Sequence, residues 1–208
     1  MASPARRDGV RRREALLDAA LRCFGARGLL GTGIEEIRRE AGASPSSVYH
    51  LFDGLPGLTL ALLTRTFERL CAHLAARVAA ATGAADAVVA LVDGHLEWVL
   101  SHPDEGRFLY QATSLDFGAD ANEALQARRS ELFSPLVAPM NRLIAEGALP
   151  PWPPSSLDVV LLGPSHEACR RFLAGAPLDP AWMRATLPRL AWQSLLRGCD
   201  EGEGRSSD

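Results

Sequence analysis

The sequence predicts an all-α protein of about nine helices. Apolar side chains recur three and four residues apart along almost the whole chain, which is the period of one helix face. Gly- and Pro-containing breaks separate these segments, and none alternates apolar with polar residues as a strand would. Apolar residues make up 47% of the 208, enough to form a core rather than a disordered chain.

The first predicted helix covers residues 10–27. Leu17, Leu21 and Phe24 fall on one face of this helix. Gly28 follows at once and is a natural stop, because glycine adopts the left-handed backbone that ends many helices.

Two short helices follow, and each has its own start signal. In "TGIEEIRREA", Thr32 is a candidate N-cap and Glu35 completes a capping box. Gly42 ends that helix. Ser44 then caps the next one, and Pro45 occupies its first position, where a missing N–H costs nothing.

The third helix, "PSSVYHLF", has barely two turns and would not be stable alone. Val48, Leu51 and Phe52 share its inner face. The remaining side chains are left for another contact; they are Ser46, Ser47, Tyr49 and His50. A helix, a capped short helix, a turn and a shorter capped helix form the helix-turn-helix arrangement.

Six further helices are predicted from the same period, at about residues 56–81, 86–101, 107–114, 122–146, 156–174 and 179–197. The segment "GALPPWPPSS" is a Pro-rich linker in which no helix can continue. The segment 201–208 is expected to be a disordered tail.

Charge is distributed unevenly along the chain. The net charge is −3, but the first sixty residues carry +2 and the rest carries −5. The first thirteen residues hold five Arg against one Asp, so residues 1–9 are expected to form a flexible basic arm. Such an arm favours contact with a polyanion; a solvated tail without a partner is the alternative.

Several classes of protein are disfavoured by the sequence. The four Cys are widely spaced, without a CxxC pair or zinc spacing, and no catalytic motif is present. We therefore expect no enzyme activity, no metal and no cofactor. No apolar run reaches membrane-spanning length and the N-terminus lacks an apolar signal region, which predicts a cytoplasmic protein without membrane contact.

The segment "ALLDAALRCFGARGLLGTGIEEIRREAGASPSSVYHLF" resembles the DNA-binding domain of the tetracycline-repressor (TetR) family. The resemblance covers about residues 10–60. The positions that carry it are Ala19, Ala20, Phe24, Gly28, Thr32, Ile37, the turn Ala41-Gly42-Ala43-Ser44, Tyr49 and Phe52.

The resemblance implies a repressor that a small molecule releases from DNA. Residues 1–54 would read a palindromic operator in double-stranded DNA, and residues 55–200 would bind an unidentified effector and form a homodimer through the last two helices. The DNA-binding positions implied are Arg6, Arg7, Arg11, Thr32, Ser44, Pro45, Ser46, Ser47, Tyr49 and His50. Open alternatives are packing of Tyr49 over the first helix and plain solvation of His50 and the arm.

The turn "DGLPGL" departs from the family pattern. The family usually has a lysine that touches phosphate where the fourth helix begins, whereas this chain has Leu55, after Gly54 and before Pro56. Gly and Pro still allow the helix to start, but the cationic contact is lost. A dimeric small-molecule-binding protein with a degenerate DNA-reading head is therefore the alternative function.

The C-terminal part offers candidates for an apolar ligand pocket and for a dimer interface. Those for the pocket are His95, Trp98, Phe108, Tyr110, Gln111, Phe133 and Met140. Those for the interface are Val160, Leu161, Gly163, Pro164, Ala168, Phe172, Leu190 and Trp192. For each pocket candidate, an ordinary place in the core is the alternative.

Overall fold

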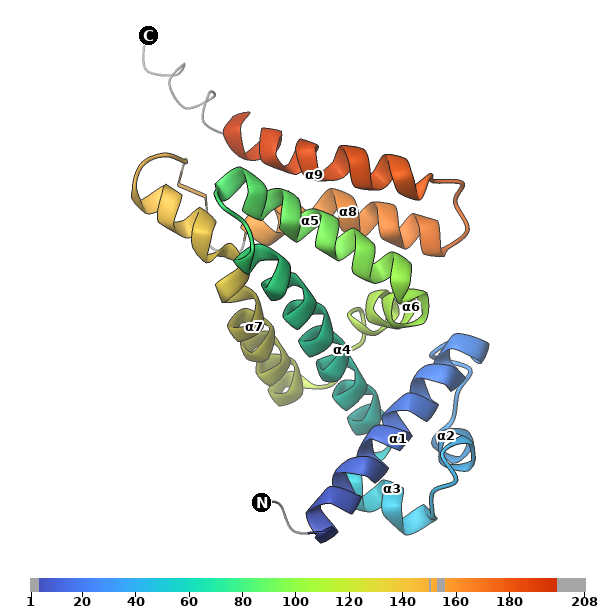
Figure 1. Ribbon diagram of the computed structural model, residues 1–208. Helices are drawn as coiled ribbons and strands as arrows, with labels where there is room; N and C mark the ends of the chain where they lie inside the picture. Colours follow the sequence, from blue (N-terminus) through green and yellow to red (C-terminus); the bar gives the residue numbers. More distant parts are fainter. Residues whose placement is uncertain (1–3, 150, 153–155, 198–208) are drawn as a thin grey trace. The chain divides into compact units, whose positions relative to one another are not determined.

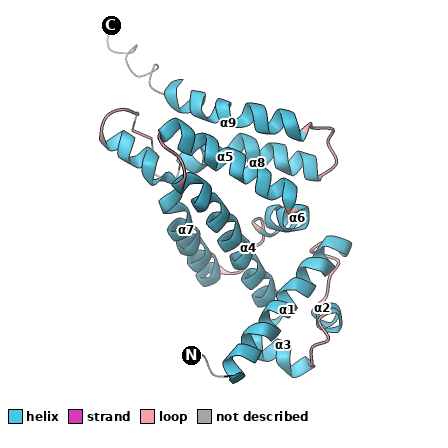
Figure 2. Ribbon diagram, in the orientation of Figure 1, coloured by secondary structure: helices cyan, strands magenta, loops and turns pink. Residues whose placement is uncertain are grey.

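The computed structural model describes residues 4–149, 151–152 and 156–197, and side chains from residue 7 to residue 196. Figure 1 shows helices joined by short loops, and Figure 2 shows no strand in this described part of the chain. The helices are α1 (Pro4–Arg27), α2 (Ile34–Glu40), α3 (Pro45–Leu51), α4 (Gly54–Ala79), α5 (Ala84–Ser101), α6 (Pro103–Ala112), α7 (Ala119–Ala145), α8 (Leu157–Leu173) and α9 (Pro180–Arg197). The predicted all-α class is thereby confirmed.

Helices α1 and α6 begin well before their predicted starts. The chain is helical from Pro4, so a flexible arm is wrong for residues 4–9, and residues 1–3 lie outside the described part. Helix α6 begins at Pro103, where the sequence suggested a break. Pro fits the first turn of a helix, and Asp104 and Glu105 favour the positive end of the helix dipole. The predicted tail, 201–208, lies outside the described residues.

The described chain divides into two compact units. One combines residues up to 67 with residues 104–125, and the other combines residues 68–103 with those from 126 onward. Helix α6 belongs to the first unit, where Phe108 stacks on Phe24 with ring centroids 5.5 Å apart. These units do not divide at residue 54. The predicted end of the DNA-binding domain at that residue therefore stays a prediction.

The core of the first unit forms around α1. Leu16, Leu17 and Phe24 are buried there, with Ile37 from α2 and Val48 from α3. This burial supplies the stability that helices as short as α2 and α3 lack alone.

An ion pair fixes the early part of α4 against α1. Arg65 donates from Nη1 to Glu14 at 2.9 Å and to Asp18 at 2.8 Å. The Arg65 side chain is only 12% exposed, so these bonds are partly shielded from solvent.

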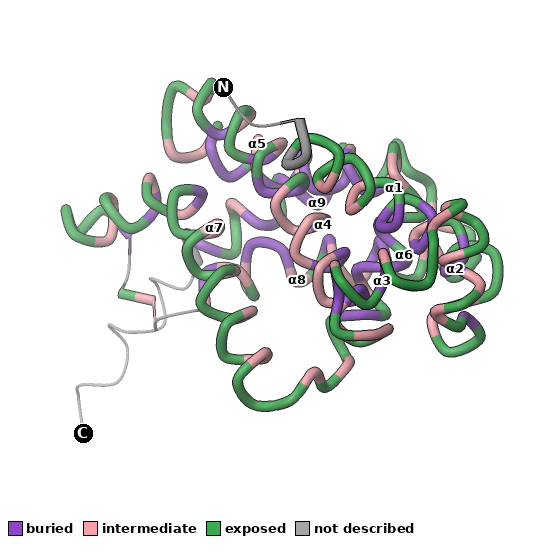
Figure 3. Tube along the Cα trace, turned by 90° about the horizontal axis from the view of Figure 1, so that it is seen from below, coloured by how far each residue is buried: buried purple, intermediate pink, exposed green. Residues whose placement is uncertain are grey.

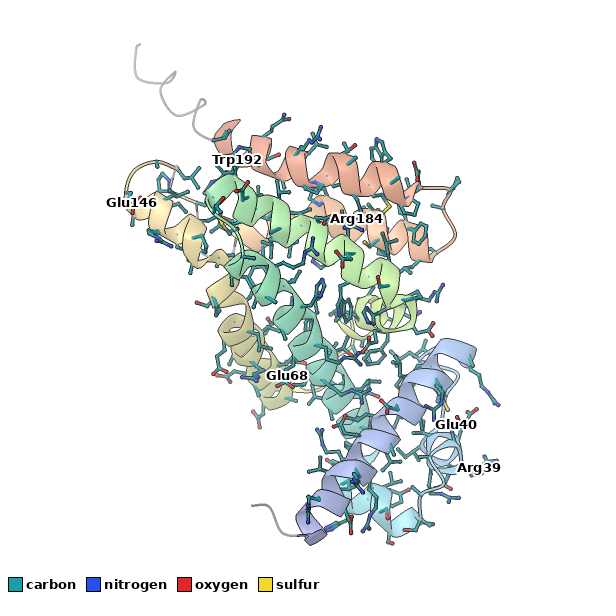
Figure 4. All side chains as sticks on the ribbon, viewed as in Figure 1. Arg39, Glu40, Glu68, Glu146, Arg184 and Trp192 are labelled. Atoms are coloured by element: carbon teal, nitrogen blue, oxygen red, sulfur yellow. The ribbon has the colours of Figure 1, made fainter. Side chains whose placement is uncertain are left out.

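In the second unit, α5 packs against α8 and α9, and its buried residues are coloured purple in Figure 3. An ion-pair network joins three helices of this unit. Arg77 of α4 bonds Asp93 at 2.7 Å and Glu97 at 2.6 Å, both on α5. Arg184 of α9, labelled in Figure 4, bonds the same two carboxylates at 2.7 and 3.2 Å. Gly94 leaves room for this network, because a Cβ there would meet Arg77 Cδ at 2.8 Å.

Three cysteines of the described part are free thiols in buried positions: Cys23, Cys71 and Cys169. Burial raises the pKa of Cys23, and it raises that of Cys71 to about 11. No helix in the described part is long and apolar enough to cross a membrane.

Candidate nucleic-acid interface

Helix α3 begins with a cluster of three hydroxyl groups. The Ser44 Oγ accepts a hydrogen bond from the Ser47 amide at 3.3 Å, which confirms Ser44 as the N-cap, and Pro45 occupies the first turn. The Ser44 hydroxyl also lies 3.1 Å from the Ser46 hydroxyl and 2.8 Å from that of Ser47. These small groups leave the first turn of α3 unobstructed.

The turn between α2 and α3 is braced by a side chain. Gly42 has a φ of +60°, a left-handed conformation that glycine adopts without steric cost. Arg38 then donates from Nη1 to the Ala43 carbonyl oxygen at 3.0 Å and from Nε to Glu35 at 2.8 Å. Arg38 was not among the predicted functional residues, although its spacing of three from Glu35 was a signal for the ion pair.

The two sides of α3 differ sharply in exposure. Val48 is 1% exposed and Phe52, just after the helix, is 7% exposed, so both anchor α3 to the core. Tyr49 is 63% exposed, and Ser46 and His50 are also exposed. Packing of Tyr49 over α1, the alternative considered from the sequence, is not what the structure shows. The exposed side of α3 is therefore available to a partner.

The structural role of Thr32 differs from the predicted one. The N-cap of α2 is Gly33, without a side-chain bond, so the capping box is wrong. Thr32 is instead 4% exposed, and its hydroxyl donates to the Gly28 carbonyl at 2.9 Å and lies 3.3 Å from the Cys23 carbonyl. This hydroxyl is occupied inside the protein, so a phosphate bond from it is wrong. A role for the nearby backbone amides stays a prediction.

Cationic side chains lie along the first turns of α1. Arg7 and Arg11 are exposed and, being four residues apart, share a helix face. The side chain of Arg6 lies outside the described part. Arg13, by contrast, packs over the ring of Phe52, since its guanidinium lies 5.6 Å from the ring centre.

The start of α4 carries no cation. Gly54 has a φ of +63°, and Leu55 is half-buried with its carbonyl accepting a bond from the Thr59 hydroxyl at 2.8 Å. Because Pro56 and Gly57 follow, the first turn of α4 presents no charged side chain.

The predicted ligand residues are divided between the two units. Phe108, Tyr110 and Gln111 belong to the first unit and the other four to the second. His95 is fully buried, with Nδ1 3.2 Å from the Ser165 hydroxyl and its ring 4.4 Å from that of His166. Trp98 and Met140 are buried as well, which is typical of core residues. None of the seven lines the two cavities described below.

Each unit contains a cavity among the described residues. The first, of about 350 Å³, lies beside Cys23 and is lined by charged residues of α1 and α2. The second, of about 710 Å³, lies between the end of α4, the start of α5 and α7. The described residues contain no cluster of three or more His, Cys, Asp or Glu that could hold a metal ion.

The N-terminal part of the chain is similar in sequence to known regulatory proteins. Residues 16–62 match the family model described as bacterial regulatory proteins of the tetR family. The HTH-type transcriptional regulator BetI of Brucella suis is 36% identical over 83 residues, which are 40% of this chain and 41% of that protein. BetI of Rhizobium meliloti is 37% identical over 81 residues, 39% of this chain and 40% of that protein. The alignments thus span only two fifths of these relatives.

Solved structures show the same fold over most of the chain. A TetR-family regulator from Marinobacter aquaeolei gives a TM-score of 0.76 at 19% identity, covering 93% of this chain and 98% of the other. The regulator FadR of Bacillus subtilis, solved with stearoyl-CoA, gives 0.73 at 10% identity, covering 86% and 96%. Residues 16–62 therefore resemble the bacterial regulatory proteins of the tetR family, and most of the chain shares the fold of these solved regulators.

Proposed function

We propose that this protein is a DNA-binding transcriptional repressor that a small molecule releases from its operator. The observation that carries the proposal is the geometry of α3. A capped two-turn helix is anchored by Val48 and Phe52 and presents Ser46, Tyr49 and His50 to solvent. A helix exposed in this way suits the major groove of DNA, with its first residues against the base edges.

Phosphate contacts would come from the flanking elements. Arg7 and Arg11 on α1 supply exposed positive charge on one helix face. Tyr49 and His50 offer donors on α3 that reach beyond the short serines. Ser46 and Ser47 discriminate bases only weakly, so much of the affinity is expected to be electrostatic. Such a protein would act in the cytoplasm, where bacterial DNA lies.

A homodimer through α8 and α9 is part of the proposal. Large apolar side chains are exposed on these helices, among them Val159 at 66%, Trp182 at 48% and Leu190 at 45%. Leu161 and Ala168 are buried inside the unit, so their inclusion in a surface for a partner is wrong. The other predicted interface residues keep some exposure: Val160, Gly163, Pro164, Phe172, Leu190 and Trp192.

The decisive experiment is binding to the DNA upstream of the protein's own gene, followed by fluorescence anisotropy over a range of salt concentrations. We expect Tyr49→Ala to weaken binding about tenfold, because it removes an exposed hydrogen-bond donor of α3. Its unfolding free energy should change by no more than about 0.5 kcal/mol, since the side chain packs against little.

Two charge variants make the test specific. Arg11→Gln should reduce the slope of log affinity against log salt by about one, because one phosphate contact is lost. Arg107→Gln makes the same change in net charge on an exposed arginine of α6 and should leave that slope unchanged. Equal slopes for the two variants would count against the assigned interface.

The second candidate is a dimeric ligand-binding protein with a degenerate DNA-reading head. The observation that favours it is the uncharged start of α4, with Leu55 where the family usually has a lysine. No binding to upstream DNA at low salt, by a protein that is folded, would support this candidate over the repressor.

A further inference from the structure

The larger of these two cavities is lined by none of the residues that were predicted to bind a ligand. It is a groove of about 710 Å³, within the range of small-molecule sites. One wall comes from the end of α4 and the loop to α5, and the other from one face of α7. All of its lining residues belong to the second compact unit.

Two prolines shape the α7 wall. Pro135 and Pro139 both line the groove, and neither has an amide hydrogen to donate within the helix. The carbonyl groups of Glu131 and Pro135 therefore lose their usual helix partners, and proline bends a helix at such points. Figure 1 shows α7 changing direction along its length.

The groove walls are apolar and built from small side chains. Six alanines line them, together with Val78, Leu136 and Leu143; the alanines are Ala75, Ala79, Ala81, Ala84, Ala87 and Ala138. No aromatic ring is among the lining residues. A flat aromatic ligand or a quaternary ammonium group would lack its usual stacking partner, whereas an aliphatic chain packs well on such walls.

The polar groups of the groove are few. Thr82 lines it, but its hydroxyl already donates to Asp86 at 2.5 Å. Arg142 lies on α7, and Glu146, labelled in Figure 4, follows four residues later, just past the end of that helix. Neither side chain makes a hydrogen bond or ion pair with another described residue.

The order of these groups along α7 gives the groove a direction. The apolar positions of residues 135–139 come first, then Arg142, and Glu146 follows just past the last helical residue. A ligand with its chain on the apolar wall therefore meets the guanidinium before the carboxylate. A guanidinium offers two parallel N–H donors that match a carboxylate.

We propose that this groove binds an aliphatic carboxylate, with the chain along the alanine-lined walls and the carboxylate on Arg142. This inference deepens the proposed function, because it assigns the chemical class of the effector.

The test is calorimetric titration of the full-length protein with decanoate, decanol and decylamine below their aggregation concentrations. Decanoate should bind once per chain, and decanol at least about tenfold more weakly, because it cannot form the charged pair. Equal or tighter binding of decylamine would overturn the proposal.

Matched variants locate the site. Arg142→Gln should weaken decanoate binding about tenfold. Arg189→Gln is the control, since Arg189 is also exposed and without a partner among the described residues. Glu146→Gln should leave binding unchanged or tighten it, because a negative charge near the ligand carboxylate is removed.

Filling the groove gives an independent check. Ala79→Phe should abolish decanoate binding, while Ala76→Phe, on an exposed position of α4 outside the groove, should not. Sedimentation of each variant tests the other occupant, a second copy of the chain. Loss of dimer by Ala79→Phe with decanoate binding intact would overturn the proposal.

The experiments distinguish a wrong groove assignment from a wrong proposed function. Titration with decanoate needs no DNA, and anisotropy with upstream DNA needs no ligand. A protein that binds its DNA but not decanoate contradicts the groove assignment alone. One that binds decanoate but no DNA supports the groove and contradicts the repressor.

Discussion

Thr32 is a residue whose sequence context and structural role differ. Its place before "GIEEI" is typical of an N-cap, but its hydroxyl lies in the interior and bonds the Gly28 carbonyl at 2.9 Å. That bond closes the loop between α1 and α2 on the core. Stability, rather than a direct hydroxyl contact with DNA, is therefore the property that this side chain controls.

We predict that Thr32→Val destabilises the protein by about 1–2 kcal/mol, because the isosteric change leaves buried carbonyl groups without a donor. Thr32→Ser keeps the hydroxyl and should lose less. Urea unfolding of the three proteins measures the difference. If Thr32→Val unfolds like the wild type but binds DNA less well, the assignment of the hydroxyl to the interior is contradicted.

Residues with local roles could be predicted from the sequence, and those with tertiary roles could not. Ser44 caps a helix that starts one residue later, so the signal and the bond lie within four positions. The bonds of Thr32 depend on how α1 and the following loop pack. The seven candidates for the ligand pocket show the same limit, since apolar periodicity marks a buried face but does not say what it faces.

At the scale of elements, the contact of α5 with α8 contains a histidine pair, in which His95 is fully buried and His166 is half-buried. Burial and the neighbouring His166 hold the pKa of His95 well below its ordinary value. Burial and Arg129 lower the pKa of His166 to about 4, and Asp158 opposes this. Ser165 lies beside His95. Both imidazoles are therefore neutral in the folded protein at neutral pH.

This pair should make stability depend on pH. Well above pH 6.5, the ordinary histidine pKa, neither state binds these protons, so the free energy of unfolding should not change on their account. Below that pH the unfolded chain takes up protons that the folded one cannot, and stability should fall until about pH 4, by roughly 3 kcal/mol for His166.

Denaturant unfolding at pH values from about 4.5 to about 7.5 measures how the free energy of unfolding depends on pH. The His166→Phe variant should flatten the curve, and His50→Asn, which changes an exposed histidine of α3, should not. Parallel curves for the wild type and His166→Phe would rule out the pair as the source.

The helices themselves were largely predictable, because each carries an apolar face with the helical period. Their ends were predictable where Gly or a capping serine marks them, as at Gly28 and Ser44. The start of α6 was missed because "HPDEG" contains residues typical of a loop. Pro and acidic residues are also typical of a first helical turn, and only the contacts of the unit decide between the two.

For the whole molecule, the exposed apolar side chains of α8 and α9 carry the prediction of a dimer. Replacing Leu190 with Glu places a charge on that surface and should give a monomer in sedimentation experiments. Gln193→Glu is the control, since it adds the same charge on an exposed polar position of α9. An unchanged dimer in Leu190→Glu would contradict the interface.

Dimer and DNA binding should be lost together. On the proposed function, a palindromic operator would be read by two copies of α3, so a monomer would keep half of the contacts. The Leu190→Glu variant should therefore lose at least about a hundredfold in DNA affinity while α3 itself is unaltered. Full affinity in a monomer would mean that the protein does not read its site as a symmetric pair.

Because the described cysteines are buried, a single introduced cysteine can be labelled selectively with a fluorophore. Cys23, Cys71 and Cys169 are buried thiols with little access to maleimide reagents, and the chain contains no lysine to compete through its amine. With Cys199, which lies outside the described residues, replaced by serine, a cysteine introduced at Ser46 would be the preferred point of attachment. A fluorophore there would sit on α3 itself, and its emission would report in real time whether DNA docks and whether an effector releases it, as the proposed function requires.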